Sequence, residues 1–224
     1  MARMPLSTKI AHITSIEQGA EKALVCKDPD LEHAISNTEA SGIPPISVSP
    51  LQGQFLAIQA RLMGAKTVLE LGALGGYSSI WLAKTGAAVT SIEIDPKHQA
   101  VASDNLRAAG FTPHVILGDA LKVLPELVEK ERQFDMVFID ADWENQTKYF
   151  EWALKLTRKG GCILIDNVVQ QLIDGHGGST GEGTLVARVG AEESVIATLV
   201  PRISGFEGVV DNAFIDGFII ATVL

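Results

Sequence analysis

The sequence is poor in cysteine and in basic residues, and each shortage excludes a class of protein. Two cysteines in 224 residues, Cys26 and Cys162, cannot form the disulfide framework of a small secreted protein, and they lie in no metal-type cluster. They predict two isolated, buried thiols in a reducing compartment. Lys and Arg number 18 against 27 Asp and Glu, which gives a net charge of -9. Nucleic acids and anionic membranes would repel such a chain, so we expect neither as a partner.

Long apolar runs are missing as well. Residues 1–10 lack the apolar stretch of a secretory signal, and no segment reaches the roughly 18 apolar residues of a membrane span. We therefore expect a cytoplasmic protein. The hydrophobic content of 46% over 224 residues is enough for one globular domain with a substantial core. No linker, repeat or low-complexity tract divides the chain, which predicts a single domain over residues 1–224.

Periodicity separates a helical first part, over residues 1–64, from an alternating second part over residues 65–224. Residues 6–41 are typical of helix, and Ser49-Pro50 begins another helix that Gly64 ends. Beyond it, short apolar runs alternate with helix-length segments, which predicts a parallel sheet covered on both faces. The parallel strands are expected at Thr67–Leu71, Ala88–Ile92, His114–Leu117, Phe134–Ile139 and Cys162–Ile165. Val195–Ile203 and Ala213–Leu224 have no helix between them and should pair as antiparallel strands.

A glycine-rich turn after the first strand predicts a ligand at the carboxyl ends of the strands. The strand runs into Gly72-Ala73-Leu74-Gly75-Gly76, where backbone can approach a ligand closely. Leu74 occupies the second glycine position of a G-x-G-x-x-G fingerprint, which argues against a nicotinamide cofactor. Glu70 would repel a pyrophosphate but suits the ammonium group of an amino acid, and Glu93 could accept hydrogen bonds from a ribose. These charges favour S-adenosylmethionine; the other interpretation is that the glycines only make a tight turn.

Several motifs together resemble the cation-dependent O-methyltransferases, a family that includes catechol and caffeoyl-coenzyme A O-methyltransferases. The resemblance runs from about Leu31 to Leu224. The motifs that carry it are Ser47–Phe55, Leu69–Gly72, Gly75–Ser78, Ile92–Asp95, Phe138–Asp142, Asp166–Val169 and Asp216–Phe218. The resemblance implies a Rossmann-like class I methyltransferase fold: an α/β sheet of seven mostly parallel strands, a C-terminal antiparallel pair and an N-terminal helical extension. Residues 1–64 would be that extension, covering a cofactor-binding sheet over residues 65–224. It also implies a homodimer, with secondary metabolism as the setting.

The resemblance assigns cofactor roles to matching residues. Val48 would cover the methionine portion, and Glu70, Gly72 and Ser78 would hold its amino and carboxylate ends. Glu93 would bind the ribose. The remaining cofactor contacts are Asp119, Ala120 and Asp140. Asp119-Ala120 would meet the adenine, although Asp119 also has the position of a helix N-cap, and the two roles could coexist.

A second constellation indicates a metal. Asp140 follows the fourth parallel strand, and Asp166-Asn167 follow the fifth, so these residues should meet at one edge of the sheet. Two carboxylates and an amide oxygen suit Mg²⁺ foremost, or Mn²⁺ or Ca²⁺, rather than zinc. From the pattern alone, helix caps and a turn explain these residues equally well. The resemblance favours metal ligands, because the family uses these three positions in that way.

One position departs from the family. Where relatives usually carry a lysine that takes the phenolic proton, this chain has Trp143, which offers no base. Three interpretations stay open: the metal alone acidifies the hydroxyl; another residue is the base, such as His176 in the glycine-rich loop predicted at Asp174–Gly178; or Trp143 forms an aromatic wall that selects the acceptor. Asp140, Trp143 and His176 are therefore the candidate catalytic residues. Simple packing of Trp143 on a helix surface is the plain alternative.

These observations predict an enzyme that transfers a methyl group from S-adenosylmethionine to a hydroxyl oxygen of a small, phenolic or catechol-like acceptor, assisted by a divalent cation. Two alternatives are a metal-independent O-methyltransferase acting on an enol or polyketide-type acceptor, and an impaired protein that binds S-adenosylmethionine without turning it over.

Overall fold

The structure, a computed structural model, describes residues 6–205 and 213–224. Within them the strands form one seven-stranded sheet in the order β3-β2-β1-β4-β5-β7-β6. The strands are β1 (Thr67–Leu71), β2 (Ala88–Glu93), β3 (Val115–Leu117), β4 (Phe134–Ile139), β5 (Thr157–Ile165), β6 (Val195–Gly205) and β7 (Ala213–Val223). The first five are parallel, and β7 is antiparallel to both β5 and β6. The predicted fold class, including the antiparallel pair, is confirmed.

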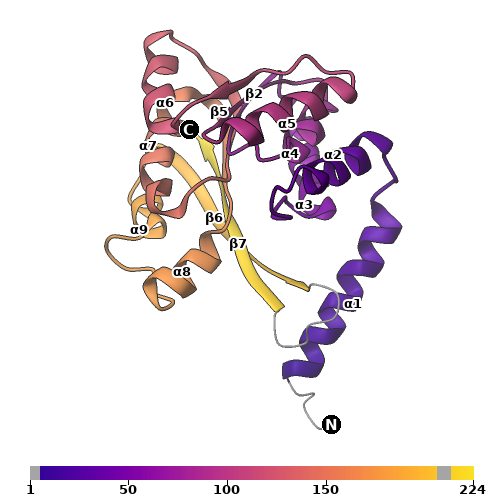
Figure 1. Cartoon of the computed structure of the whole chain (residues 1–224). Coiled ribbons are helices and arrows are strands. Elements are labelled where there is room, and N and C mark those ends of the chain that lie inside the picture. Colours follow the sequence, from indigo (N-terminus) through magenta and orange to yellow (C-terminus); the bar gives the residue numbers. More distant parts are fainter. Residues whose placement is uncertain (1–5, 206–212) are drawn as a thin grey trace.

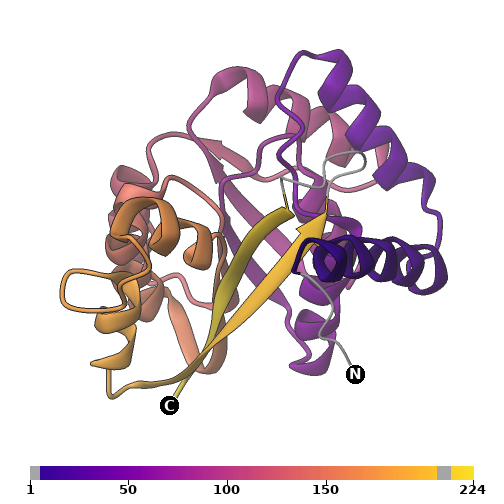
Figure 2. The ribbon, with the colours of Figure 1, turned by 90° about the horizontal axis from the view of Figure 1, so that it is seen from below.

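Helices cover both faces of this sheet (Figure 1). One face carries α2 (Pro29–Ala40), α3 (Pro50–Leu62), α4 (Tyr77–Ala83) and α5 (Pro96–Ala108). The other carries α6 (Ala120–Glu129), α7 (Gln146–Leu156), α8 (Val168–His176) and α9 (Leu185–Gly190), with a short 3₁₀ turn, η1 (Trp143–Asn145), before α7. Viewed from below, α8 and α9 lie on one side of the β6–β7 ribbon and the N-terminal helices on the other (Figure 2).

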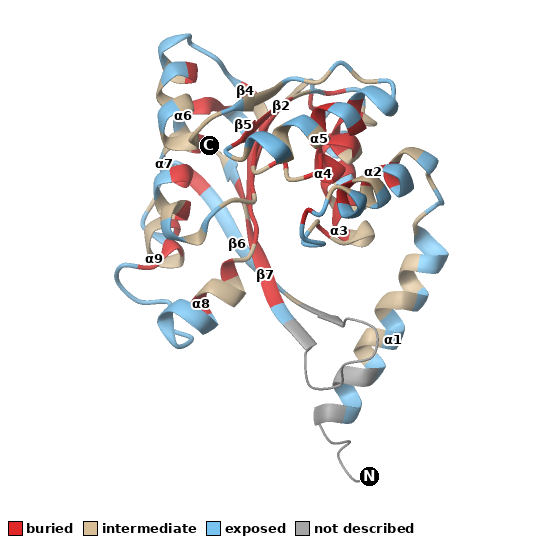
Figure 3. Cartoon of the chain, viewed as in Figure 1, coloured by how far each residue is buried: buried red, intermediate tan, exposed pale blue. Residues whose placement is uncertain are grey.

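Alternation along the strands sends side chains into two separate cores. On β4, Met136 and Phe138 pack under α3 and α4, whereas Val137 and Ile139 pack under α6 and α7. All four are fully buried, and burial concentrates on the strands and on the inner faces of the helices (Figure 3). Successive side chains of a strand point to opposite faces of the sheet, and helices cover both faces. Nearly every position along a central strand is therefore buried, which explains why the strands appear in the sequence as continuous apolar runs.

The N-terminal region differs in detail from the prediction. The helical stretch is divided into α1 (Leu6–Leu24) and α2, because Asp28 accepts hydrogen bonds from the N–H groups of Asp30 and Leu31 and so caps a new helix. Cys26 lies in the interruption and is exposed, so the prediction of two buried thiols is wrong for Cys26 and confirmed for Cys162.

The helices α2 and α3 are part of the main body. They pack on α4 and α5 and share their core, whereas α1 lies at the side of the molecule and contacts β6 and α3 (Figure 1). The division at residue 64 stays a prediction. None of the helices within residues 6–205 and 213–224 is both long and apolar enough to cross a membrane.

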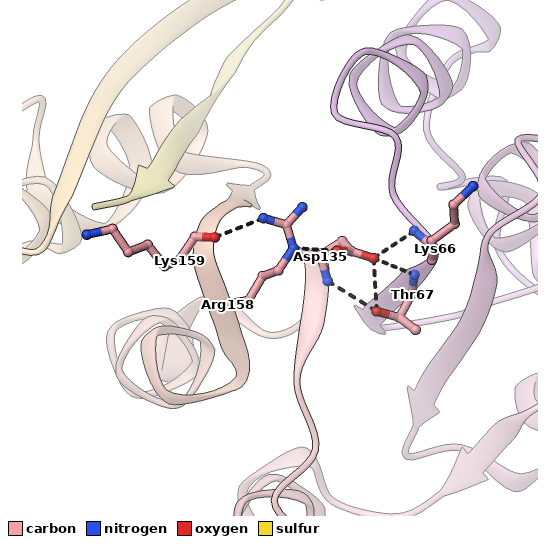
Figure 4. A network of polar contacts seen from close by, with 5 residues as sticks. All are labelled: Lys66, Thr67, Asp135, Arg158 and Lys159. Carbon is pink, nitrogen blue, oxygen red and sulfur yellow. Dashed lines mark hydrogen bonds and ion pairs between the residues drawn. The ribbon is translucent and has the colours of Figure 1, made fainter.

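A partly buried carboxylate joins three parts of the sheet at the end opposite the carboxyl ends of β1 and β4 (Figure 4). Asp135, near the start of β4, accepts hydrogen bonds from the N–H groups of Lys66 and Thr67, at 2.7 and 2.8 Å, and from Arg158 Nε at 2.5 Å. Burial alone would raise the pKa of Asp135, but these donors outweigh it and lower that pKa to about 2. The ionised form therefore stabilises the fold.

We expect Asp135→Asn to lower the free energy of unfolding by about 2 kcal/mol at pH 7, since the pKa lies almost two units below its usual value. Because the pKa of Asp135 is lowered in the folded protein, its carboxylate stabilises the fold fully at pH values above 3.8, the ordinary pKa of the group. This stabilisation is lost as the pH falls toward 2. The difference between wild type and variant should therefore shrink between pH 4 and pH 2. Urea unfolding across this range measures it.

Asp104→Asn provides a matched control, because Asp104 is exposed and forms an exposed ion pair with Arg107 on α5. Such pairs contribute about 0–1 kcal/mol. If Asp135→Asn were no more destabilising than this control, the role of the Asp135 network would be disproved.

Candidate active site

The carboxyl ends of the central strands meet at one edge of the sheet. Backbone hydrogen bonds continue past the strands: the N–H of Asp140 donates to the carbonyl of Leu71, and the N–H of Asp166 donates to that of Ile139, both at 2.9 Å. Because β1, β4 and β5 are parallel neighbours, Gly72, Asp140 and Asp166 follow at equivalent positions on adjacent strands. The predicted clustering of the two aspartates is observed.

Gly72 has a structural reason to be glycine. Its φ of +88° lies in the left-handed region, and a Cβ there would overlap the carbonyl oxygen of Asp140. Gly76 also has a positive φ, +80°, and precedes α4. The turn thus brings bare backbone to the end of β1, directly beside β4.

Glu93 at the end of β2 binds this turn. Its Oε2 accepts hydrogen bonds from the N–H groups of Ala73 and Leu74, at 3.1 and 2.8 Å, and its Oε1 accepts from the N–H of Asp95. Glu93 is 6% exposed. It therefore anchors the glycine turn, and its predicted contact with a ribose stays a prediction alongside that structural role.

Asn105 on α5 holds the same turn from the opposite side, and sequence reasoning missed it. Its Nδ2 donates to the carbonyl oxygen of Gly75 at 2.8 Å, and its Oδ1 accepts from Asn37 on α2 at 2.7 Å. A Cβ at Gly75 would overlap the side chain of Thr38. The glycine turn is therefore locked to α2, a connection that no local motif could have indicated.

Glu70 on β1 is fully buried behind the turn. Its Oε2 accepts hydrogen bonds from the hydroxyls of Ser79 and Ser91. Burial raises the pKa of Glu70, and hydrogen bonds from Ser78, Ser79 and Ser91 oppose that rise. Its Oε1 has no hydrogen-bond partner within the described residues. The predicted pairing of Glu70 with an ammonium group would provide one.

Asp166 and Asn167 are held by several polar neighbours. Gln52 Nε2 donates to Asp166 Oδ2 at 2.6 Å, and Gln146 donates to the backbone carbonyl of Asp166 at 2.7 Å. Asn167 has a positive φ of 60°, unusual for a residue with a side chain, and its Nδ2 donates to Asp216 Oδ2 at 2.8 Å. That bond fixes the amide, so that its carbonyl oxygen is left to accept other contacts.

The carboxylates in this cluster disfavour one another's charge. Burial and the neighbouring charge of Asp166 raise the pKa of Asp140 well above its usual range, with Glu70 adding to the effect. Burial likewise raises the pKa of Asp166 to about 6, although the guanidinium of Arg202 opposes it. Packing negative charge at one point is costly unless a cation compensates it.

The donor set fits a hard cation. Asp166 Oδ1 is buried without a hydrogen-bond partner in the described part of the chain. Across residues 6–205 and 213–224, no three His, Cys, Asp or Glu side chains form a metal-binding group, so a cation at this edge needs the amide of Asn167 as its third protein ligand. Two carboxylates and an amide oxygen are ligands typical of Mg²⁺. Asp142 binds Tyr149 and Asn145 instead.

The other predicted residues lie at different distances from this cluster. Val48 is buried in the segment before α3. Asp119 caps α6 by accepting from the N–H of Leu121 at 2.9 Å, so its expected capping role is confirmed. Ala120 is the first residue of α6. Ser78, in the first turn of α4, is buried, and its hydroxyl is among the groups that oppose the rise in the pKa of Glu70.

Trp143 and His176 are placed differently from each other. Trp143 is half-buried in η1, and its backbone carbonyl accepts a 2.9 Å hydrogen bond from Gln171 of α8. His176 is exposed and is the last residue of α8, so its placement in a loop was wrong. Within the described structure, none of the contacts connects His176 to the aspartate cluster.

The sequence of this chain is similar to those of a known protein family and of individual relatives. The sequence model of the O-methyltransferase family matches residues 21–175. This chain belongs to that O-methyltransferase family. It is 41% identical over 201 residues to a catechol O-methyltransferase of Niastella koreensis, covering 84% of this chain and 90% of the relative. It is 43% identical over 155 residues to a catechol O-methyltransferase of Mycobacterium tuberculosis, covering 67% and 70%.

Solved structures agree with the fold of the methyltransferase. An O-methyltransferase from Bacillus cereus, determined with S-adenosylhomocysteine, has a TM-score of 0.81 at 36% identity, covering 96% of this chain and all of that one. TomG from Streptomyces achromogenes, determined with S-adenosylmethionine, has a TM-score of 0.80 at 30% identity, covering 98% and 99%. The predicted family, class I fold and enzyme class are therefore confirmed, and the roles of single residues stay predictions.

Proposed function

We propose that this O-methyltransferase transfers a methyl group from S-adenosylmethionine to a hydroxyl oxygen of a small catechol-like or phenolic acceptor, with a divalent cation at Asp140, Asp166 and Asn167. The observation that carries the proposal is the adjacency of the glycine turn and the aspartate cluster at one sheet edge. A cofactor on the turn and an acceptor on the cation would be neighbours. Two relatives named catechol O-methyltransferase support the choice of acceptor.

Bound S-adenosylmethionine would supply an activated methyl group. The chain's own residues then have to bind and orient it. The backbone at Gly72, which has no side chain, would admit close approach of the ligand, and Glu93 keeps the turn in shape through the N–H groups of Ala73 and Leu74. The carboxylate of Glu70 would pair with the ammonium group of the methionine portion of the cofactor. Orientation of this kind can provide a large share of a methyltransferase's rate enhancement.

A bound divalent cation would lower the pKa of an acceptor hydroxyl, which is about 10 for a free phenol. Asp140 and Asp166 provide the negative charge that holds such an ion, and Asp216 fixes the amide of Asn167. Trp143 has no basic group, so we propose that it shapes the acceptor site rather than removing a proton. A homodimer and the absence of nucleic-acid and membrane partners stay predictions.

Glu93→Ala should weaken S-adenosylhomocysteine binding about 10- to 100-fold, the usual effect of losing a hydrogen bond to a charged group. Calorimetry measures the affinity, with exposed Glu129→Ala on α6 as control. A 2′,3′-dideoxy analogue separates two roles. If Glu93 also binds the ribose, the variant should lose more affinity for S-adenosylhomocysteine than for the analogue; equal losses for both ligands would show that Glu93 acts only through the turn.

Asp166→Ala should abolish cation-stimulated methyl transfer to a catechol while cofactor affinity changes little, because the cation would contact the acceptor. The measurements are radiolabelled methyl transfer with Mg²⁺ or with EDTA, and calorimetry with the cofactor product. Asp174→Ala is the matched control, since Asp174 is exposed on α8. Full wild-type activity in excess EDTA would overturn the cation's role and favour the metal-independent alternative.

Trp143→Ala should raise KM for the acceptor, because a half-buried aromatic provides apolar contact that alanine cannot replace. Trp143→Lys should not restore a faster enzyme, since it removes the same surface and places a positive charge near the proposed cation. Steady-state kinetics on one catechol test both variants. A strong acceleration by Trp143→Lys would show that the wild-type residue impairs catalysis, as the alternative of a binding protein requires.

A further inference from the structure

A chain of three side chains from different parts of the sequence ends at Asp166. Arg202 on β6 donates from Nη1 to Oε1 of Gln52 on α3, and Gln52 donates from Nε2 to Oδ2 of Asp166 at 2.6 Å. Arg202 and Asp166 lie 150 and 114 positions from Gln52 in the sequence, so only the folded chain brings the three residues together. Neither Gln52 nor Arg202 has a role in the function proposed above.

The chemistry of this chain permits one orientation of the Gln52 amide. A guanidinium has only donors, and an ionised carboxylate has only acceptors. The amide oxygen must therefore face Arg202, and the amide nitrogen must face Asp166. Gln52 is 4% exposed, so water cannot substitute for either contact at low cost.

This orientation decides which oxygen of Asp166 is free. Gln52 occupies Oδ2, whereas Oδ1 is buried and has no hydrogen-bond partner among the described residues. Gln146 holds the backbone carbonyl of the same residue and so limits rotation of the peptide. The two contacts leave one carboxylate oxygen, in one position, for a further ligand.

We propose that Gln52 and Arg202 are positioning residues for the cation: Arg202 sets the amide of Gln52, and Gln52 turns Asp166 so that Oδ1 is presented to the metal. This inference rests on the proposed function. A hydrogen-bonded partner behind a metal-binding carboxylate commonly changes metal affinity 10- to 100-fold. The charge of Arg202 alone would act in the opposite sense, because it would repel a cation.

The test is Mn²⁺ binding to the purified full chain, followed by electron paramagnetic resonance and with Mg²⁺ as competitor. Gln52→Leu should weaken Mn²⁺ binding about 10-fold or more. Arg202→Lys keeps the charge but lacks the planar guanidinium, and it should weaken binding several-fold. In the Gln52→Leu background, Arg202→Lys should have no further effect, because the contact through which Arg202 acts is already gone.

Gln59→Leu, on the same helix α3, is the matched control and should bind Mn²⁺ like wild type. Thermal unfolding and binding of S-adenosylhomocysteine report whether each variant is folded. If Gln52→Leu does not fold, Arg202→Lys alone still tests the proposal.

Three outcomes would overturn the proposal. If each single variant bound Mn²⁺ with an affinity within twofold of that of the wild type, neither Gln52 nor Arg202 would be a positioning residue, although the cation site itself would stand. Additive effects of the two substitutions would show that Arg202 does not act through Gln52. A wild-type protein without saturable Mn²⁺ binding would instead overturn the cation site itself, and this inference with it.

Discussion

The parallel register of β1, β4 and β5 is the constraint on which the site depends. It places Gly72, Asp140 and Asp166 at equivalent positions on neighbouring strands, with the chain continuing to hydrogen-bond beyond the strand ends. The carbonyl of Asp140 lies where a Cβ of residue 72 would be, so the two strand ends can approach this closely only with glycine. The close approach brings the glycine turn and the aspartate cluster together.

Concentrating acids at this edge has an energetic cost that the surrounding structure reduces only in part. Glu70, Asp140, Asp166 and Asp216 all lie within electrostatic reach, and burial together with mutual repulsion raises the pKa values of Asp140 and Asp166. Arg202 opposes both shifts. Such an arrangement is costly to stability and useful to a site that is completed by a cation, which is why the acids are better explained by ligand binding than by packing.

The opposite end of the sheet shows how a partly buried carboxylate is stabilised by the chain itself. Asp135 receives two backbone N–H groups and a guanidinium, and its pKa falls to about 2. Asp166, directly after the neighbouring strand β5, has one oxygen without a hydrogen-bond partner among the described residues and a pKa of about 6. The two residues therefore have opposite roles in one sheet, the first structural and the second available for chemistry.

The sequence by itself determined the fold class, the order of strands and helices, and most of the residues at the sheet edge. Apolar periodicity and capping residues such as Ser49 and Asp119 act over a few positions, so they can be interpreted locally. The aspartates after the fourth and fifth parallel strands were predicted to meet because parallel strands end at the same side. The resemblance to relatives added their expected roles.

Only the tertiary structure decided which side chains support that edge. Asn105 reaches the glycine turn from α5, Asp216 fixes Asn167 from β7, and Arg202 reaches Gln52 from β6. These contacts join residues 30 to 150 positions apart, and their sequence surroundings carry no spacing that would pair them. Long-range packing and buried hydrogen bonds decide such details, because they depend on distances that only the folded chain defines.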